Sequence, residues 1–279
     1  MIKKLSTFLF GLLILTSLSH AETYKIYIGN SAGSLSDVYT RKVFDHVEKI
    51  TGDNFIVINK PGADQMLAYQ TFLEESKHNP NVIYSSGTAT QVSSYVVHPQ
   101  LKLDPLKDTK SLITVARVQY HLIVKNESPI KSSKDLKGKL NIGTSNSTTT
   151  TLIKKSSFPA DIQLIPYKSD NEVILALLKN EIDVASAISL NPLIRSHKDK
   201  IRIVTSFEEL NVTGATGYTV ANDFPKEKFD KLHRALDQVL RHPDIQQWFI
   251  TNMGTTTVGG KPEQYDQIIQ RFKKVILDK

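Results

Sequence analysis

Short apolar runs alternate with longer amphipathic stretches along the first part of the chain. The runs at 24–28, 55–58 and 82–84 have the length and the β-branched or aromatic content of buried strands. Between them, the stretches 35–50 and 66–73 carry apolar residues at helical spacing. Strands separated by helices of this length predict βαβ units and a mostly parallel sheet.

The same alternation restarts near the middle of the chain and predicts a second α/β unit. Its strands are expected at 122–124, 140–143, 162–165, 182–185 and 201–204. A helix is expected at 171–178, and a glycine-flanked strand at 214–217 precedes two amphipathic helices, over 229–239 and 265–276. Because open parallel sheets bind ligands at the carboxyl ends of their strands, the two units predict a ligand cleft between them.

The composition is that of a globular protein. The 279 residues are 40% hydrophobic and 23% charged, which excludes fibrous, disordered and polytopic membrane proteins. The length suits one large domain or two of roughly 100–150 residues each. The net charge of +7 is too small and too scattered to indicate nucleic-acid binding. The absence of cysteine excludes disulfides, thiolate metal sites and cysteine nucleophiles.

The segment 1–21 has the order of a secretory signal peptide. Lysines at 3–4 precede an apolar run at 8–18, and the triplet 19–21 (Ser-His-Ala) supplies a small-x-small cleavage site. The apolar run is too short to span a bilayer comfortably, which disfavours the alternative of an uncleaved membrane anchor. We therefore predict cleavage after Ala21 and a soluble, exported mature protein.

Small polar residues form the turns after several predicted strands, at 30–34, 85–88 and 144–149. Where such a turn opens a helix, its free backbone N–H groups and the positive end of the helix dipole bind anions. Several of these turns at one cleft would hold a carboxylate without an arginine. Ordinary helix capping and plain βα turns explain the same residues, and the pattern alone leaves both interpretations open.

Six short motifs, in order along nearly the whole mature chain, resemble those of one protein family. The segment 32–37 (Ala-Gly-Ser-Leu-Ser-Asp) resembles an Ala-Gly-Gly-x-x-Asp ligand loop, and 57–63 resembles a Val-x-Asn-(Arg/Lys)-Pro-Gly-Ala segment. The other segments with such a resemblance are 103–108, 166–168, 181–183, and 241–244 with 252–254. The family is that of the substrate-binding components of tripartite tricarboxylate transporters, also called Bug-type receptors.

The resemblance implies an α/β, class II periplasmic-binding-protein fold, with two lobes joined by crossing strands and a ligand cleft between them. It implies that lobe 1 comprises 22–120 plus 222–279, that lobe 2 comprises 121–221, and that the crossings lie near 118–123 and 217–222. It also implies a monomeric periplasmic protein that captures a small organic acid or a related metabolite. The partners would be this small-molecule ligand and the subunits of a membrane permease, to which it is delivered.

The candidate ligand-binding residues come from the three polar turns and one later acidic residue: Ala32, Gly33, Ser34, Ser36, Asp37, Ser85, Ser86, Thr88, Thr144, Ser145, Asn146, Ser147, Thr148, Thr149 and Asp183. The family's mode of binding uses backbone N–H groups, hydroxyls and bridging waters more than charged side chains. Ser34 stands where the family has a second glycine, and Asp64 and Gln65 replace the last two glycines of a Gly-Ala-Gly-Gly segment. These departures change the donors and acceptors, so the identity of the ligand does not follow from the resemblance.

Two other functions fit the same fold. One is a sensor subunit that presents its closed, loaded form to a signalling partner, and the other is an exported enzyme on the two-lobe scaffold. The eight histidines have no metal-ligand spacing, and nothing resembles a nucleophile elbow, a phosphate-binding glycine loop or a dinucleotide fingerprint. We therefore expect no enzymatic activity, no metal site and no cofactor.

Overall fold

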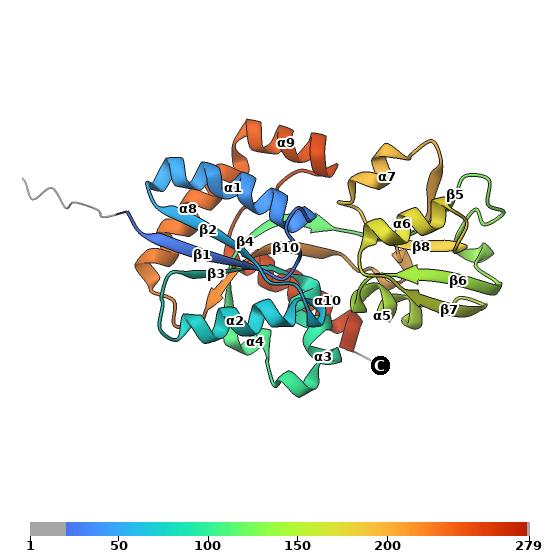
Figure 1. Ribbon diagram of the computed structural model, residues 1–279, viewed down its shortest axis with the longest axis horizontal. Coiled ribbons are helices and arrows are strands. Elements are labelled where there is room, and N and C mark those ends of the chain that lie inside the picture. The colour runs from blue at the N-terminus through green and yellow to red at the C-terminus, as the bar shows by residue number, and fades with distance from the viewer. Residues whose placement is uncertain (1–20, 278–279) are drawn as a thin grey trace, which may run out of the picture.

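Two α/β lobes lie side by side along the long axis of the molecule and are joined by extended segments (Figure 1). The computed structural model describes residues 21–277, so the signal peptide expected over 1–21 lies outside the described residues, except for Ala21. Among the described residues, no helix combines the length and the apolar character that a bilayer span requires.

Lobe 1 is built around a five-stranded sheet. Its strands are β1 (Thr23–Ile28), β2 (Asn54–Asn59), β3 (Val82–Gly87), β4 (Thr109–Val118) and β10 (Gly214–Ala221). They lie in the order β2-β1-β3-β10-β4. β1 pairs in parallel with β2 and β3, whereas β10 is antiparallel to β3 and β4.

The strands of lobe 2 form a second five-stranded sheet with the same plan. They are β5 (Tyr120–Lys125), β6 (Gly138–Thr144), β7 (Ala160–Pro166), β8 (Val184–Ile188) and β9 (Ile201–Thr205), in the order β7-β6-β8-β5-β9. β6 is parallel to β7 and β8, and β5 is antiparallel to β8 and β9. In each sheet, the strand that follows a crossing from the other lobe is antiparallel to the other strands. It enters the sheet at the edge where the other strands have their carboxyl ends. Both sheets are therefore mixed.

The chain crosses between the lobes twice. The first crossing lies at Gln119, between β4 and β5, within the expected range. The second lies at 206–213, between β9 and β10, and not near 217–222 as the family resemblance implies. Residues 214–221 therefore belong to the sheet of lobe 1, because β10 pairs with β3 and β4. A glycine-flanked apolar run is typical of a strand in either lobe. Only the strands with which it pairs show to which lobe it belongs.

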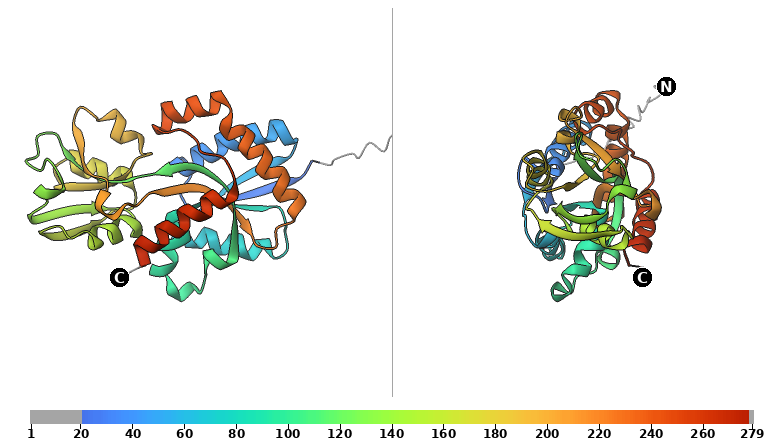
Figure 2. Two further views of the ribbon diagram at one scale, coloured as in Figure 1. Left: turned by 180° about the vertical axis from the view of Figure 1, so that it is seen from behind. Right: turned by 90° about the vertical axis from the view of Figure 1, so that its right-hand side faces the viewer.

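Helices cover both sheets. Those of lobe 1 are α1 (Leu35–Thr51), α2 (Met66–Ser76), α3 (Tyr95–Val97), α4 (Pro105–Asp108), α8 (Lys226–Arg241), α9 (Pro243–Met253) and α10 (Pro262–Leu277), with a π-helical segment η2 (Ala89–Ser94) before α3. Those of lobe 2 are α5 (Ser147–Lys155), α6 (Asp170–Leu178) and α7 (Pro192–Ser196). α10 packs on β4 and β10 and reaches α5, so the last helix contacts both lobes (Figure 2).

The buried face of α1 differs from the face that the spacing of apolar residues predicts. That spacing assigns Val38 and Ile50 to the core together with Val43 and Val47. Val43 and Val47 are buried, but Val38 and Ile50 are 41% and 43% exposed. Phe44 is buried in their place and packs edge-on against a tyrosine of β10, which aliphatic spacing does not predict.

Candidate ligand-binding site

The loop 144–149 runs from the last residue of β6 into the first turn of α5, and it lies within a run of eight hydroxyl or amide side chains at 144–151. Asn146 is the N-cap of α5, and its side-chain oxygen accepts a hydrogen bond from the Thr149 amide at 2.9 Å. Thr149 is fully buried and donates its hydroxyl back to Asn146. The Thr144 hydroxyl accepts a hydrogen bond from Thr150 at 3.2 Å. Thr144, Asn146 and Thr149 therefore shape the start of α5.

Two side chains of the same loop reach lobe 1. Ser147 Oγ donates a hydrogen bond to Asp64 Oδ2, and Thr148 Oγ1 donates to Ser93 Oγ at 2.9 Å. Asp64 lies between β2 and α2, and Ser93 lies in η2, so both bonds join the lobes. We call the residues 62–65, 88–94 and 144–149 the interlobe junction.

The loop 62–65 has a left-handed backbone, with φ between 45° and 137° at all four residues. A non-glycine residue costs about 1–2 kcal/mol in this region, so the surroundings must hold it there. Gln65 supplies the contacts. Its carbonyl oxygen accepts a hydrogen bond from Tyr84 Oη at 3.3 Å, and its side-chain oxygen accepts one from Thr90 Oγ1 at 2.9 Å.

Gly29, the residue after β1, packs directly against the same loop. A Cβ at this position would lie 2.4 Å from Gln65 Cβ and 2.7 Å from Gln65 Cα. Only glycine allows the end of β1 and the loop to approach so closely. Gly29, Tyr84 and Thr90 together fix Gln65, and the backbone then presents the neighbouring Asp64 to lobe 2.

Thr88 contacts the first residues of β5 and β10, directly after the two crossings. Its hydroxyl oxygen is 3.2 Å from Tyr120 Oη and accepts a hydrogen bond from the Ala215 amide at 3.3 Å. A Cβ at Gly214 would lie 2.6 Å from each of the two hydroxyl oxygens. Burial raises the pKa of Tyr120 to about 12, so its hydroxyl keeps its proton at neutral pH. Thr88 thus links the end of β3 to both crossings.

Asp170, the first residue of α6, brings a second carboxylate to the loop 144–149. Ser145 Oγ donates a hydrogen bond to Asp170 Oδ1. Burial raises the pKa of Asp170, and the hydrogen bond from Ser145 opposes this shift. Two serines of one loop therefore donate to two carboxylates, Asp170 of lobe 2 and Asp64 of lobe 1.

Asp37 organises the loop that opens α1. It is 4% exposed and accepts hydrogen bonds from the Gly33 amide at 2.9 Å and from Arg41 Nε at 3.0 Å. Burial opposes the ionisation of Asp37, but these two bonds, a hydrogen bond with Asn59 and the positive charge of Arg41 together outweigh it and lower its pKa. Asp37 thus orients the loop, and it accepts the hydrogen bond that the Gly33 N–H group would otherwise offer to a ligand.

The other candidates in this loop are partly or fully exposed. Ser34 is the N-cap of α1 but makes no capping bond, and its hydroxyl lies 3.3 Å from that of Ser36. Ser36 Oγ donates to the Asn30 side chain at 2.9 Å. Ala32 is exposed. Among the described residues, the side-chain hydrogen bonds of this loop stay within residues 30–59, so its residues stay candidates on the lobe 1 side alone.

Replacing Asp37 with asparagine is expected to lower the free energy of unfolding at neutral pH by about 1.5–3 kcal/mol, the value of hydrogen bonds to a charged group. Because the folded pKa of Asp37 is lowered from 3.8, its contribution is present above that pH and is lost as the pH falls through the folded pKa. Urea unfolding of the wild type and the variant at pH 7 and at pH 3 measures the difference in the free energy of unfolding at each pH. Asp45→Asn, at an exposed position of the same helix, is the control; an equal effect of both variants would contradict the prediction.

Ser85 and Ser86 lie within β3 and not in the turn after it. β3 extends to Gly87, because its last residues pair with β10. The Ser85 hydroxyl lies 3.4 Å from that of Thr40, and the Ser86 hydroxyl lies 3.1 Å from Tyr265 Oη. Both serines are buried inside lobe 1. The structure therefore does not bring their hydroxyls to the interlobe junction.

Asp183 is also separate from the junction. It precedes β8, is exposed, and accepts a hydrogen bond from the Asn141 amide at 2.8 Å. Asn141 is three residues before the end of β6, about 10 Å along the strand at ~3.3 Å per residue. Asp183 lines a cavity of about 530 Å³ in lobe 2, with Lys125 and Glu127. It thus bonds a backbone N–H group, as an acidic residue with a structural role would.

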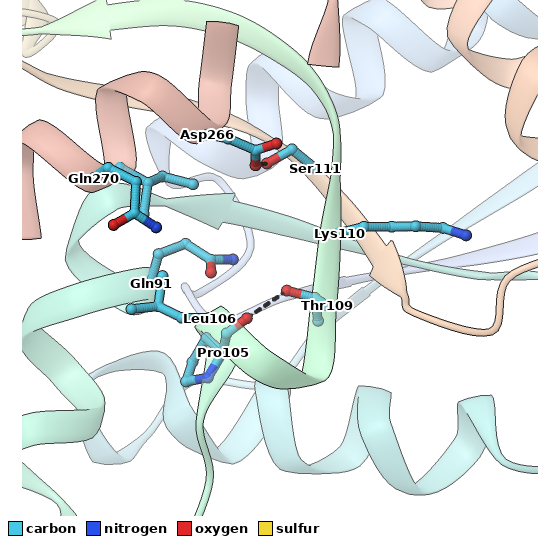
Figure 3. Close-up of a pocket in the computed structure, with 9 residues that line it drawn as sticks. Gln91, Pro105, Leu106, Thr109, Lys110, Ser111, Asp266 and Gln270 are labelled. Atoms are coloured by element: carbon cyan, nitrogen blue, oxygen red, sulfur yellow. Dashed lines mark hydrogen bonds between the residues drawn. The ribbon is translucent and has the colours of Figure 1, made fainter. Parts of the chain in front are cut away.

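A cavity of about 330 Å³ lies in lobe 1 beside η2, β4 and α10 (Figure 3). Ser111 Oγ donates a hydrogen bond to Asp266 at 2.6 Å on its wall, and Lys110 points away from it. Gln91 lines this cavity, whereas Ser93 of the same segment faces the junction. None of the candidate residues lines it.

Within residues 21–277, no group of three or more His, Cys, Asp or Glu side chains is placed to hold a metal ion.

Sequence reasoning omitted three residues that the structure places at or beside the junction. Ser93, Tyr120 and Asp170 carry no local signal, because their partners lie 25 to 55 residues away along the chain. Asp64 does carry one. It occupies a glycine position of the Gly-Ala-Gly-Gly segment, of which only Gly62 and Ala63 are retained.

Comparison with known proteins identifies the family. The model described as "Tripartite tricarboxylate transporter family receptor" matches residues 39–276. The chain belongs to this family. The description is that of a receptor family, which confirms the resemblance carried by the six motifs.

One curated relative of this receptor is the UPF0065 protein in gbd 5'region of Cupriavidus necator. The two are 28% identical over 197 residues, which cover 66% of this chain and 59% of the relative. A UPF0065 protein of Bordetella pertussis is 26% identical over 192 residues, which cover 63% of this chain and 58% of that protein. The matches thus span less than two thirds of the length of these relatives.

A solved structure confirms the two-lobe α/β fold of the receptor. A Rhodopseudomonas palustris protein with adipate has a TM-score of 0.76, at 18% identity, over 92% of this chain and 97% of that chain. At this level of identity, the likeness shows the fold alone.

Proposed function

We propose that this receptor is an exported periplasmic solute-binding protein. It captures a small organic acid or a related metabolite at the interlobe junction, and it delivers this ligand to the permease subunits of a tripartite tricarboxylate-type transporter. In this proposal lobe 1 comprises 22–118 and 214–277, and lobe 2 comprises 120–205, as the two sheets divide the chain.

The two hydrogen bonds from Ser147 and Thr148 to lobe 1 carry the proposal. They connect the start of α5 with loops that follow strands of lobe 1. The first turn of a helix leaves N–H groups without intrahelical partners and bears the positive end of the helix dipole, which suits a carboxylate. A ligand held there would bond to both lobes and so keep them together. Family membership and the adipate in the related structure support an organic acid.

The mature protein is expected to open and close around its ligand, because the bonds of Ser147 and Thr148 must break to admit a molecule to the junction. A thermal-shift screen of small organic acids identifies a binder, and small-angle X-ray scattering then measures the radius of gyration with and without it. We expect a smaller radius with the ligand. Calorimetry establishes first that the ligand binds. If the radius of gyration then stays the same when this ligand is added, the result contradicts closure.

A further inference from the structure

The cavity beside η2 in lobe 1 holds a buried polar group that no described residue satisfies. The cavity has a volume of about 330 Å³ and lies between η2, α4, β4 and α10 (Figure 3). Gln91 lines it and is only 2% exposed, yet its Nε2 atom has no hydrogen-bond partner among the described residues. A buried donor without a partner is costly, and native proteins contain few of them. The partner of this amide therefore comes from outside the chain.

The cavity is separate from the contacts that join the lobes, although η2 contributes to both. Ser93 of η2 accepts a hydrogen bond from Thr148 of lobe 2, whereas Gln91 of the same segment lines the cavity. The other lining residues lie outside the interlobe junction, in α4, β4 and α10 of lobe 1. A molecule in this cavity would contact lobe 1 alone, so the inference does not depend on the proposed function of the junction.

The fixed charge that faces the cavity is negative. Asp266 accepts a hydrogen bond from Ser111 Oγ at 2.6 Å, and the ion pairs of the described residues do not include it. Lys110 is the sole cation among the described lining residues, and it points away from the cavity. Its Nζ donates instead to the carbonyl oxygens of Asn222 and Phe224, at 3.0 Å each. An anionic ligand would therefore meet Asp266 without a compensating charge, which disfavours it.

We propose that this cavity is a second binding site, for a small neutral molecule with several hydroxyl groups, such as a polyol or a monosaccharide. A hydroxyl group both donates and accepts hydrogen bonds. One hydroxyl would accept from Gln91 Nε2, and another would donate to the Asp266 carboxylate in a charge-assisted bond. Pro105, Leu106 and Ile269 supply apolar walls for the C–H groups of the ligand. The volume lies at the lower end of the range for ligand pockets, which suits a molecule of this size.

Xylitol and glutarate test the site, because both are five-carbon chains and only glutarate is charged. The readout is the NMR signal of the Gln91 side-chain amide in the ¹⁵N-labelled mature protein, which is assigned by its loss in Gln91→Met. This signal reports on the cavity itself. We expect xylitol to shift it saturably, with a dissociation constant in the millimolar range that is usual for so small a ligand. Glutarate at the same concentrations is expected to cause a much smaller shift.

Gln270→Trp and Gln267→Trp are matched variants. Both replace an exposed glutamine of α10, but only Gln270 lines the cavity. The indole ring at position 270 is expected to occupy the opening and to weaken xylitol binding by about tenfold or more, whereas Gln267→Trp should bind like the wild type.

Gln91→Met keeps the length of the side chain and removes the unpartnered amide. Because the buried donor disappears, we expect the ligand-free variant to have a Tm about 2–4 °C above that of the wild type. We also expect it to lose xylitol binding, which saturation-transfer NMR on the xylitol signals measures. A gain in stability together with a loss of binding would indicate that the amide is kept for a ligand.

Three results would overturn the inference. If xylitol causes no saturable shift of the Gln91 signal, water alone is the partner of the amide. If the two tryptophan variants bind xylitol equally well, the ligand does not lie in this cavity. If glutarate shifts the Gln91 signal as strongly as xylitol does, the site does not select a neutral molecule. None of these results bears on the proposed function, which concerns the interlobe junction.

Discussion

Replacing Gly29 with alanine is expected to destabilise the protein by about 1–3 kcal/mol or more and to abolish ligand binding at the junction. The new Cβ would lie 2.4 Å from Gln65 Cβ and 2.7 Å from its Cα, and the backbone atom cannot move without shifting the loop. Gln65 fixes the left-handed loop that carries Asp64, so the same shift displaces the lobe 1 side of the junction. Urea unfolding and calorimetric titration measure the two effects.

Gly87→Ala is the matched control for Gly29→Ala. Gly87 ends β3, close to the junction, and a Cβ there would meet its nearest neighbour, the Ala215 carbonyl oxygen, at 3.6 Å. This is ordinary van der Waals contact, so the free energy of unfolding should stay within about 0.5 kcal/mol of the wild type. Equal stability and equal binding of the two variants would show that Gly29 does not position the loop.

Replacing Ser147 with aspartate is expected to hold the lobes apart and to weaken ligand binding by several orders of magnitude. Ser147 donates to Asp64 across the junction, so the substitution puts two carboxylates at hydrogen-bond distance. Two unit charges at 4 Å repel by about 4 kcal/mol at an effective dielectric constant of 20. The helix itself tolerates the change, because aspartate is favourable in the first turn of a helix.

Small-angle scattering and titration with a known binder measure the effect of Ser147→Asp. We expect a larger radius of gyration than that of the wild type in the presence of ligand. Ser157→Asp adds the same charge at an exposed position after α5 and should behave like the wild type. Ser147→Ala removes only the bond and should cost about 0.5–1.5 kcal/mol of binding free energy. If Ser147→Asp binds as tightly as Ser147→Ala, the loop does not face Asp64 in the closed protein.

The positions of most strands and helices could be predicted from the sequence. The run at 24–28 lies within β1, the run at 55–58 lies within β2, and the stretch 35–50 corresponds to α1. These predictions succeed because the burial of side chains follows the local period of a strand or a helix. The face of α1 was predicted less well, because aromatic residues of the core interrupt its aliphatic spacing.

The candidate site was predictable only in part. The loop 144–149 was identified from its run of polar residues, and the structure places two of its side chains against lobe 1. The same reasoning failed to place Ser85 and Ser86, since a serine that extends a strand and a serine that begins a turn look alike in sequence. The pairing of β3 with β10 decides between them, and β10 follows β3 by more than a hundred residues.

By itself, the sequence determined the order of strands and helices, the polar character of the turns and the family to which the chain belongs. These features depend on residue types at short spacing, which the sequence states directly. Only the tertiary structure decided that Ser147 meets Asp64, 83 residues earlier, and that Thr148 meets Ser93, 55 residues earlier. Those contacts depend on how the two crossings bring the lobes together, and a contact between residues so far apart leaves no periodic signal in the chain.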